Sequence, residues 1–109
     1  MEIKSGVTLR GLQPIMRPVL REAERIWKDY GREFGVTVTE ACGGTHSASS
    51  WHYYGYALDL RTRYFPDEVK TQVYEELKGS CKDYDIILHS THIHAEISNS
   101  LANQLGVLY

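Results

Sequence analysis

The segment HSTHIHAE, residues 89–96, concentrates side chains that can bind a metal or transfer a proton. It contains His89, His92 and His94, three of the chain's five histidines, and it ends with Glu96. Neutral imidazole is a frequent zinc ligand, and it also titrates close to neutral pH. Both kinds of chemistry need partner groups, so further polar residues must come from elsewhere in the chain.

A second polar group precedes this segment in WHYYGYALDL, residues 51–60. His52 and Asp59 are seven residues apart, and Gly55 between them would let the backbone turn so that His52 comes back over the strand that follows. Two imidazoles and one carboxylate, with a fourth position left to water, form the usual ligand set of catalytic zinc. The residue pattern also fits a polar cluster satisfied by its own hydrogen bonds, and both interpretations stay open at this point.

Alternating polarity indicates how these residues are presented. A strand over 92–97 would turn its histidines and Glu96 to one face and its apolar residues to the core. The run 56–62 alternates in the same way, with Leu58 and Leu60 toward the core and Asp59 on the opposite face. The pattern therefore predicts coordinating groups on the open face of a packed sheet.

The rest of the chain supplies elements that could carry such a sheet. Apolar spacing predicts an amphipathic helix within 13–35, with Phe34 on its core face and Gly35 as its C-terminal cap, and a second helix over 66–82. Strands are expected over 36–42 and 84–89, the latter buried, with a loop at 43–50 and a short helix within 98–109. This order predicts a single α+β domain, 1–109, with a small, mostly antiparallel sheet that has helices on one face and the site on the other.

Composition excludes several classes of partner. The 109 residues are 42% hydrophobic and 24% charged, with a net charge of -2 and no basic stripe, so no nucleic-acid partner is expected. No apolar run approaches the roughly 20 residues that span a bilayer, so no membrane partner is expected either. The start, MEIKSGVTLRGL, lacks the features of a signal peptide, which predicts synthesis in the cytoplasm and, for any role outside it, release by other means. Two cysteines, Cys42 and Cys81, are too few for a cysteine-rich zinc site. They are expected to be buried free thiols rather than a disulfide. The protein is expected to be a monomer.

Both polar segments resemble motifs of one enzyme family. SSWHYYGYALDL is similar to the S-x-H-x-x-G-x-A-x-D motif of the zinc D-Ala-D-Ala carboxypeptidase and murein peptidase family, with matches at Ser50, His52, Gly55, Ala57 and Asp59. HIHAE resembles the second motif of that family, and the resemblance covers about 36–97. The secreted hedgehog signalling domain shares this zinc scaffold, so the scaffold alone does not establish catalysis.

The resemblance implies a ligand set and a reaction. It implies Zn²⁺ held by His52, Asp59 and His94. His92 would sit beside the site and contact a ligand or the transition state, and Ser50 would be a hydrogen-bonding residue that orients a ligand. The family hydrolyses peptide bonds beside D-amino acids in cell-wall peptidoglycan, with water activated at the zinc. The short chain would suit a phage or prophage lysis or tail enzyme that acts on the cell wall after release.

The chain departs from the family pattern at two places. Thr91 stands where relatives often carry an acidic general base, which makes His89 the first candidate for proton transfer and leaves Glu96 as a weaker one that pairs with an imidazole. The loop CGGTHS lacks the arginine that binds a substrate carboxylate in relatives, and Arg61 and Arg63 are the possible substitutes. Two alternatives to an active peptidase follow: a zinc-binding domain that binds wall peptides or a protein partner without turnover, and a metal-free interaction domain.

Overall fold

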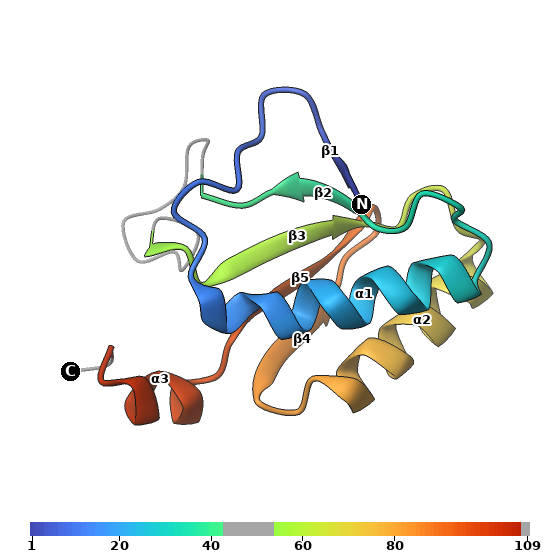
Figure 1. Ribbon diagram of the computed structural model, residues 1–109. Helices are drawn as coiled ribbons and strands as arrows, with labels where there is room; N and C mark the ends of the chain where they lie inside the picture. The colour runs from blue at the N-terminus through green and yellow to red at the C-terminus, as the bar shows by residue number, and fades with distance from the viewer. Residues whose placement is uncertain (43–53, 108–109) are drawn as a thin grey trace.

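A five-stranded mixed sheet forms the centre of the α+β fold in the computed structural model, which describes residues 1–42 and 54–107 (Figure 1). The strand order is β1-β2-β3-β5-β4. β1 runs parallel to β2, whereas β2 with β3, β3 with β5, and β5 with β4 pair antiparallel. The strands are β1 (Glu2–Ile3), β2 (Thr37–Glu40), β3 (Ala57–Arg61), β4 (Tyr84–Leu88) and β5 (His92–Ile97).

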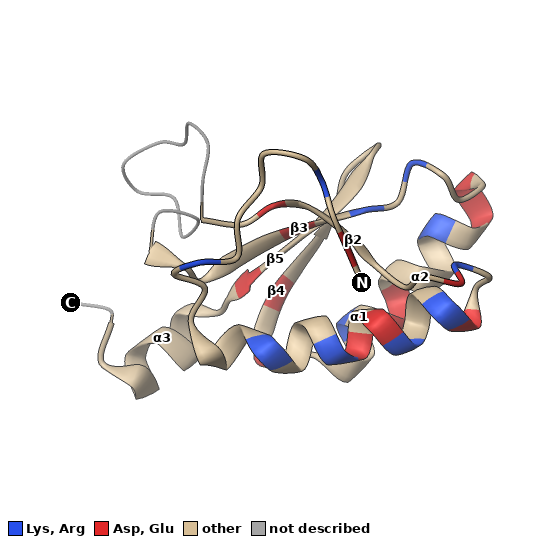
Figure 2. Cartoon of the chain, turned by 45° about the horizontal axis from the view of Figure 1, so that its top comes forward, with Lys and Arg blue, Asp and Glu red and all other residues tan. Residues whose placement is uncertain are grey.

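The two longer helices, α1 and α2, pack against each other on one face of the sheet (Figures 1 and 2). A 3-10 turn, η1 (Pro14–Met16), leads into α1 (Arg17–Asp29), where Pro18 occupies the first turn and its missing N–H is not needed. The other helices are α2 (Asp67–Ser80) and the short α3 (Asn99–Leu105). Within 1–42 and 54–107, no helix combines the length and apolarity needed to cross a bilayer.

The core lies between the helices and the inner face of the sheet. Leu58 and Leu60 of β3 and the apolar residues of β5 are fully buried, while the polar residues of β5 are only half-buried. The faces predicted from alternation for these two strands are therefore confirmed. Trp27 of α1 ties helix to sheet, because its Nε1–H donates to the carbonyl oxygen of Arg61 at 2.9 Å and its ring meets the Phe65 ring edge-on.

The predicted end of the first helix is wrong. α1 ends at Asp29, because Gly31 adopts a left-handed conformation with φ of 97° and stops the helix four residues before Gly35. The N–H of Gly31 donates to the carbonyl of Lys28 and that of Arg32 to Trp27, which is the Schellman arrangement. Phe34 consequently lies beyond the helix and is 66% exposed instead of packing in the core.

Two strands also differ from expectation. β1 was not predicted, since two residues carry no period. It forms through the N–H groups of Glu2 and Lys4, which donate to the carbonyls of Val36, just before β2, and Val38. β4 was expected to be buried, but it lies at the edge of the sheet with Asp85 and Ile87 exposed. An edge strand of a sheet with one covered face needs apolar residues on one side only.

The two cysteines are free thiols. Cys81, at the end of α2, is buried as predicted, and burial raises its pKa to about 11. Cys42 is only half-buried, so the prediction of a second buried thiol is wrong, although desolvation raises its pKa as well.

Candidate metal centre

The register of β3 against β5 brings the two polar segments together. Asp59 pairs directly with His94 and Arg61 with His92, although each pair is more than 30 residues apart in sequence. Their neighbours Leu58 and Leu60 point to the core, so the polar partners lie on the face away from α1 and α2. Direct cross-strand neighbours have Cβ atoms about 5 Å apart, which lets short polar side chains meet.

The His94 imidazole bridges two carboxylates on this open face. Its Nδ1 lies 2.8 Å from Oδ1 of Asp59, and its Nε2 lies 2.7 Å from Oε1 of Glu96. All three side chains are largely shielded, with exposed fractions of 18% for His94 and Asp59 and 26% for Glu96. Both ring nitrogens are therefore engaged, and the ring orientation is fixed.

This environment changes the pKa of His94. Burial disfavours the charged imidazolium and acts to lower the pKa, but the hydrogen bonds to Asp59 and Glu96 outweigh it. The net effect raises the pKa of His94 to about 9 in the metal-free protein. A proton thus occupies the position between His94 and Asp59 at neutral pH.

A metal ion shared by these two atoms would require them to move slightly apart. Zinc at about 2.0–2.2 Å from an imidazole nitrogen and a carboxylate oxygen, in tetrahedral geometry, would hold these atoms about 3.4 Å apart. The observed 2.8 Å between Nδ1 of His94 and Oδ1 of Asp59 needs only a small opening. Glu96 on the second ring nitrogen completes the carboxylate–histidine arrangement that orients metal-binding imidazoles.

The complete predicted ligand set cannot be assembled from the described residues. His52, the third expected ligand, lies outside them, as does Ser50. Within 1–42 and 54–107, no three histidine, cysteine, aspartate or glutamate side chains are arranged to hold a metal ion. Two of the three predicted ligands, Asp59 and His94, are adjacent.

Gly55 has the backbone conformation predicted for it. Its φ is 79°, and a Cβ there would collide with the carbonyl oxygen of Gly11. The carbonyl of Gly55 also accepts a hydrogen bond from the N–H of Gln13 at 3.0 Å. The turn before β3 therefore requires glycine, while the return of His52 over the strand stays a prediction.

His89 and His92 form a stacked imidazole pair beside the Asp59–His94–Glu96 chain. Their rings stack with centroids 4.7 Å apart, and the N–H of His89 donates to the carbonyl of His92. Nε2 of His92 lies 3.9 Å from Oδ2 of Asp59, and its Nδ1 lies 3.1 Å from the Thr91 hydroxyl. Of the predicted catalytic residues, His92 thus lies near the predicted ligand Asp59, and His89 stacks on His92 and is exposed.

Glu40 is a neighbour of the site that sequence reasoning missed. A register shift between Val38 and Glu40 places Glu40 opposite Asp59. Simple alternation from the buried Val38 would turn Glu40 toward the core, and only the irregularity reverses this. An acidic residue at the end of a β-branched run is the one available signal. Arg61, named as a substitute substrate-binding residue, is half-buried opposite His92, whereas Arg63 is exposed.

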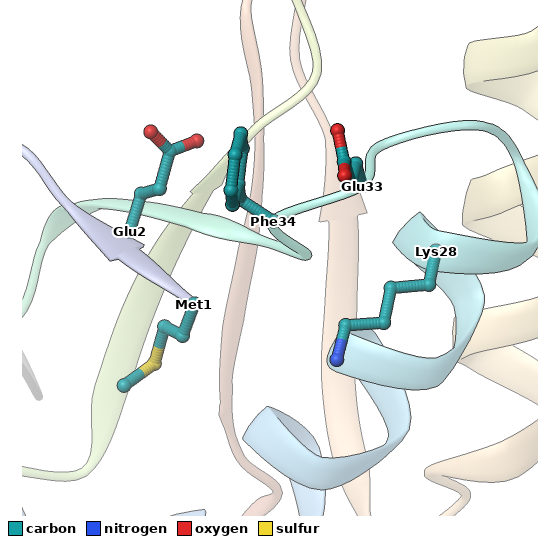
Figure 3. Close-up of a pocket in the computed structure, with 5 residues that line it drawn as sticks. All are labelled: Met1, Glu2, Lys28, Glu33 and Phe34. Carbon is teal, nitrogen blue, oxygen red and sulfur yellow. The ribbon is translucent and has the colours of Figure 1, made fainter.

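A separate hollow lies near the C-terminal end of α1. It has a volume of about 410 Å³ (Figure 3) and is lined by Met1, Glu2, Lys28, Glu33 and Phe34. None of these residues belongs to β3 or β5, so this hollow is not part of the histidine site.

Comparison with known proteins finds no matching family model and no matching curated relative. The assignment of a function therefore depends on the residues, their motifs and their geometry.

Proposed function

We propose that the protein is a zinc-dependent peptidase that hydrolyses a peptide bond in bacterial peptidoglycan, with His52, Asp59 and His94 as the metal ligands. The observation that carries the proposal is the Asp59–His94–Glu96 chain of hydrogen bonds on the open face of the sheet. The resemblance of SSWHYYGYALDL and HIHAE to the murein peptidase motifs supplies the substrate class, a peptide that contains D-amino acids.

In this proposal Glu96 prepares His94 for the metal. A carboxylate on Nε2 holds the ring proton there and leaves Nδ1, which faces Asp59, as the coordinating atom. The pKa of about 9 means that a proton must leave the imidazole before a metal binds at neutral pH. A bound zinc ion would supply Lewis acidity, which polarises a carbonyl oxygen and lowers the pKa of bound water so that it can act as a nucleophile near neutral pH.

The stacked histidines would serve the proton transfers and the developing charge. Nε2 of His92, which lies near Asp59, is suited to donate a hydrogen bond to the carbonyl oxygen of the substrate as negative charge builds on it. His89 is exposed beside it and takes the proton-transfer role, because Thr91 offers no carboxylate at the position usual in the family.

In this proposal two further residues position the substrate. Arg61, opposite His92 across the strands, could bind a terminal carboxylate of the peptide, and Ser50 would orient the ligand. With Arg61 engaged the enzyme would act as a carboxypeptidase, and without it as an endopeptidase on an internal bond of the stem peptide or cross-bridge. A lysis-type enzyme of phage or prophage origin is consistent with either activity.

The release of amino groups from purified peptidoglycan tests the proposal. We expect release by the zinc-loaded protein, loss of release with a chelator, and recovery when zinc is added back. His94→Ala and Asp59→Asn should abolish release, while Asp85→Asn, an exposed carboxylate on the adjacent β4, should leave it unchanged. Chelator-insensitive release, or none from walls of several chemotypes, would remove the proposal.

A zinc-binding domain without turnover is the second candidate, and Thr91 is the reason for it. The Thr91 hydroxyl is bonded to His92 and is no base near neutral pH. This candidate predicts about one zinc per chain and a melting temperature that falls with chelator, but no amino-group release at high protein concentration. If the protein does cleave, an unaffected His89→Ala variant would show that His89 is not the proton-transfer residue.

A metal-free interaction domain is separated from both by elemental analysis. About one zinc per chain in protein purified without added metal, lost in His52→Ala and Asp59→Ala, would exclude it.

A further inference from the structure

The sequence motifs that identified the site assign no role to the hydrogen bond between Thr91 and His92. The Thr91 hydroxyl lies 3.1 Å from Nδ1 of His92, at the start of β5. A hydroxyl can donate or accept, so the tautomer of His92 decides the direction of this bond. In a neutral imidazole one nitrogen carries the proton and the other accepts.

The charge on the other side of the His92 ring favours one direction. Nε2 lies 3.9 Å from Oδ2 of Asp59, and an ionised carboxylate only accepts hydrogen bonds. A proton is therefore favoured on Nε2, the nitrogen that faces the site. Nδ1 is then the acceptor, and the Thr91 O–H donates to it.

The backbone holds Thr91 where this bond needs it. The carbonyl oxygen of Thr91 accepts from the N–H groups of both Thr62 and Arg63, at 3.0 and 3.1 Å. One residue earlier, the carbonyl of Ser90 accepts from Nζ of Lys70 in α2 at 2.8 Å. The β4–β5 turn is thus tied to the end of β3 and to a helix, and the His89 ring limits rotation of His92 from one side.

We propose that Thr91 is a positioning residue that holds His92 as the Nε2–H tautomer, with this N–H directed at the site beside Asp59. This inference concerns the orientation of His92 itself, and its role in the reaction rests on the proposed function. Thr91 then has a different role from the acid that relatives carry at this position. It makes His92 a hydrogen-bond donor toward the reacting carbonyl oxygen, so that His92 does not act as the base. The base must be another group, which agrees with the assignment of His89.

The test measures the tautomer of His92 in the metal-free protein by long-range ¹H–¹⁵N NMR of the ring nitrogens. The spectra are recorded at a pH where the two nitrogens show the separate shifts of a neutral ring. In the unmodified protein we expect the Nε2–H form to predominate. Thr91→Val, which removes the hydroxyl and keeps the shape, should reduce the ratio of Nε2–H to Nδ1–H by about fivefold, the fold-change expected for one ordinary hydrogen bond.

Two further variants keep the result specific. Thr91→Ser retains the hydroxyl and should restore the ratio. Thr71→Val removes a threonine hydroxyl that bonds the Asp67 carbonyl in α2, away from the site, and should leave the ratio unchanged. A predominant Nδ1–H form in the unmodified protein, or a Thr91→Val ratio equal to it, would overturn the inference.

Kinetics on peptidoglycan with zinc-loaded protein separate this inference from the proposed function. Thr91→Val should lower kcat by the factor by which the Nε2–H fraction of His92 falls and should change KM little, because the bond to the substrate oxygen strengthens in the transition state. An unchanged kcat in a variant with a shifted tautomer would overturn the role of Thr91 in the reaction. No hydrolysis by the unmodified protein would overturn the proposed function and leave the tautomer assignment standing.

Discussion

At the scale of single residues, the proton on His94 is the competitor of any metal. Between Asp59 and Glu96 the pKa of His94 reaches about 9, so zinc must displace a proton from it throughout the neutral range. We expect the apparent zinc affinity to rise by up to about tenfold per pH unit toward pH 9 and then to level off. Competition with a chromophoric chelator measures it. An affinity independent of pH between 7 and 9 would contradict coordination by His94.

Glu96 should matter for zinc affinity although it is not a predicted ligand. Its Oε1 lies 2.7 Å from Nε2 of His94, the nitrogen that faces away from Asp59. Glu96→Gln keeps an acceptor but removes the charge that strengthens the imidazole as a ligand, and we expect zinc affinity to fall by about 10- to 100-fold. Asp85→Asn is the matched control, because Asp85 pairs with Glu96 across the strands and is exposed. An equal loss of zinc affinity in both variants would show that the effect comes from the loss of any nearby negative charge and not from the Glu96–His94 contact.

At the scale of elements, the two faces of the β4–β5 hairpin should contribute differently to the free energy of unfolding. Ile93 in β5 is fully buried, whereas Ile87 in β4, opposite His94, is 45% exposed. Ile93→Ala should lower the free energy of unfolding by about 2–5 kcal/mol through lost burial and a cavity. Ile87→Ala should lower it by about 1 kcal/mol or less. Urea unfolding followed by circular dichroism measures both, and equal losses would contradict the assignment of the inner face.

Alternation made the faces of the strands predictable, because side-chain direction in a strand is local information. The pattern in 56–62 and 92–97 was enough to place Asp59 and His94 on the open face. Their exact pairing was not, since register depends on how two distant strands align and on where each begins. The resemblance to family motifs suggested that they meet, but only coordinates give the 2.8 Å contact.

Other features depended on details that a periodic pattern does not contain. The position of Glu40 follows from one irregularity between β2 and β3, which reverses the face of a single residue. The end of α1 follows from the choice between Gly31 and Gly35, both of which can adopt left-handed backbone conformations. β1 has two residues and takes its stability from hydrogen bonds to β2, so nothing in its own sequence indicates a strand.

At the scale of the whole molecule, the sheet divides two tasks between its faces. Its inner face, under α1 and α2, supplies the buried apolar surface that stabilises the fold, and its outer face carries the Asp59–His94–Glu96 chain. The two faces share the same strands. A metal bound on the outer face would therefore stabilise the entire folded state, in proportion to the logarithm of its free concentration.

Cys81 offers a direct measurement of that coupling. It is buried at the end of α2 with a pKa of about 11, so at pH 8 only about one thiol in a thousand is ionised while the protein is folded. In the unfolded chain the pKa returns to about 8.5, so this contribution to stability is present below about pH 8.5 and is lost as the pH rises toward 11. In the single-thiol variant Cys42→Ala, labelling of Cys81 by a disulfide reagent at pH 8 should therefore follow the unfolded fraction.

Zinc bound on the outer face of the sheet should then slow the labelling of Cys81, which lies on the other side of the sheet. At a free concentration of about 100 times the Kd, binding to the folded state alone should reduce the unfolded fraction, and with it the labelling rate, by about a hundredfold. Asp59→Asn should abolish most of this protection, because it removes one of the two adjacent predicted ligands. The half-buried Cys42, measured in Cys81→Ala, should react much faster than Cys81 under the same conditions. A Cys81 rate that zinc leaves unchanged would mean that the metal does not bind the folded protein at this site, and the ligand assignment would be wrong.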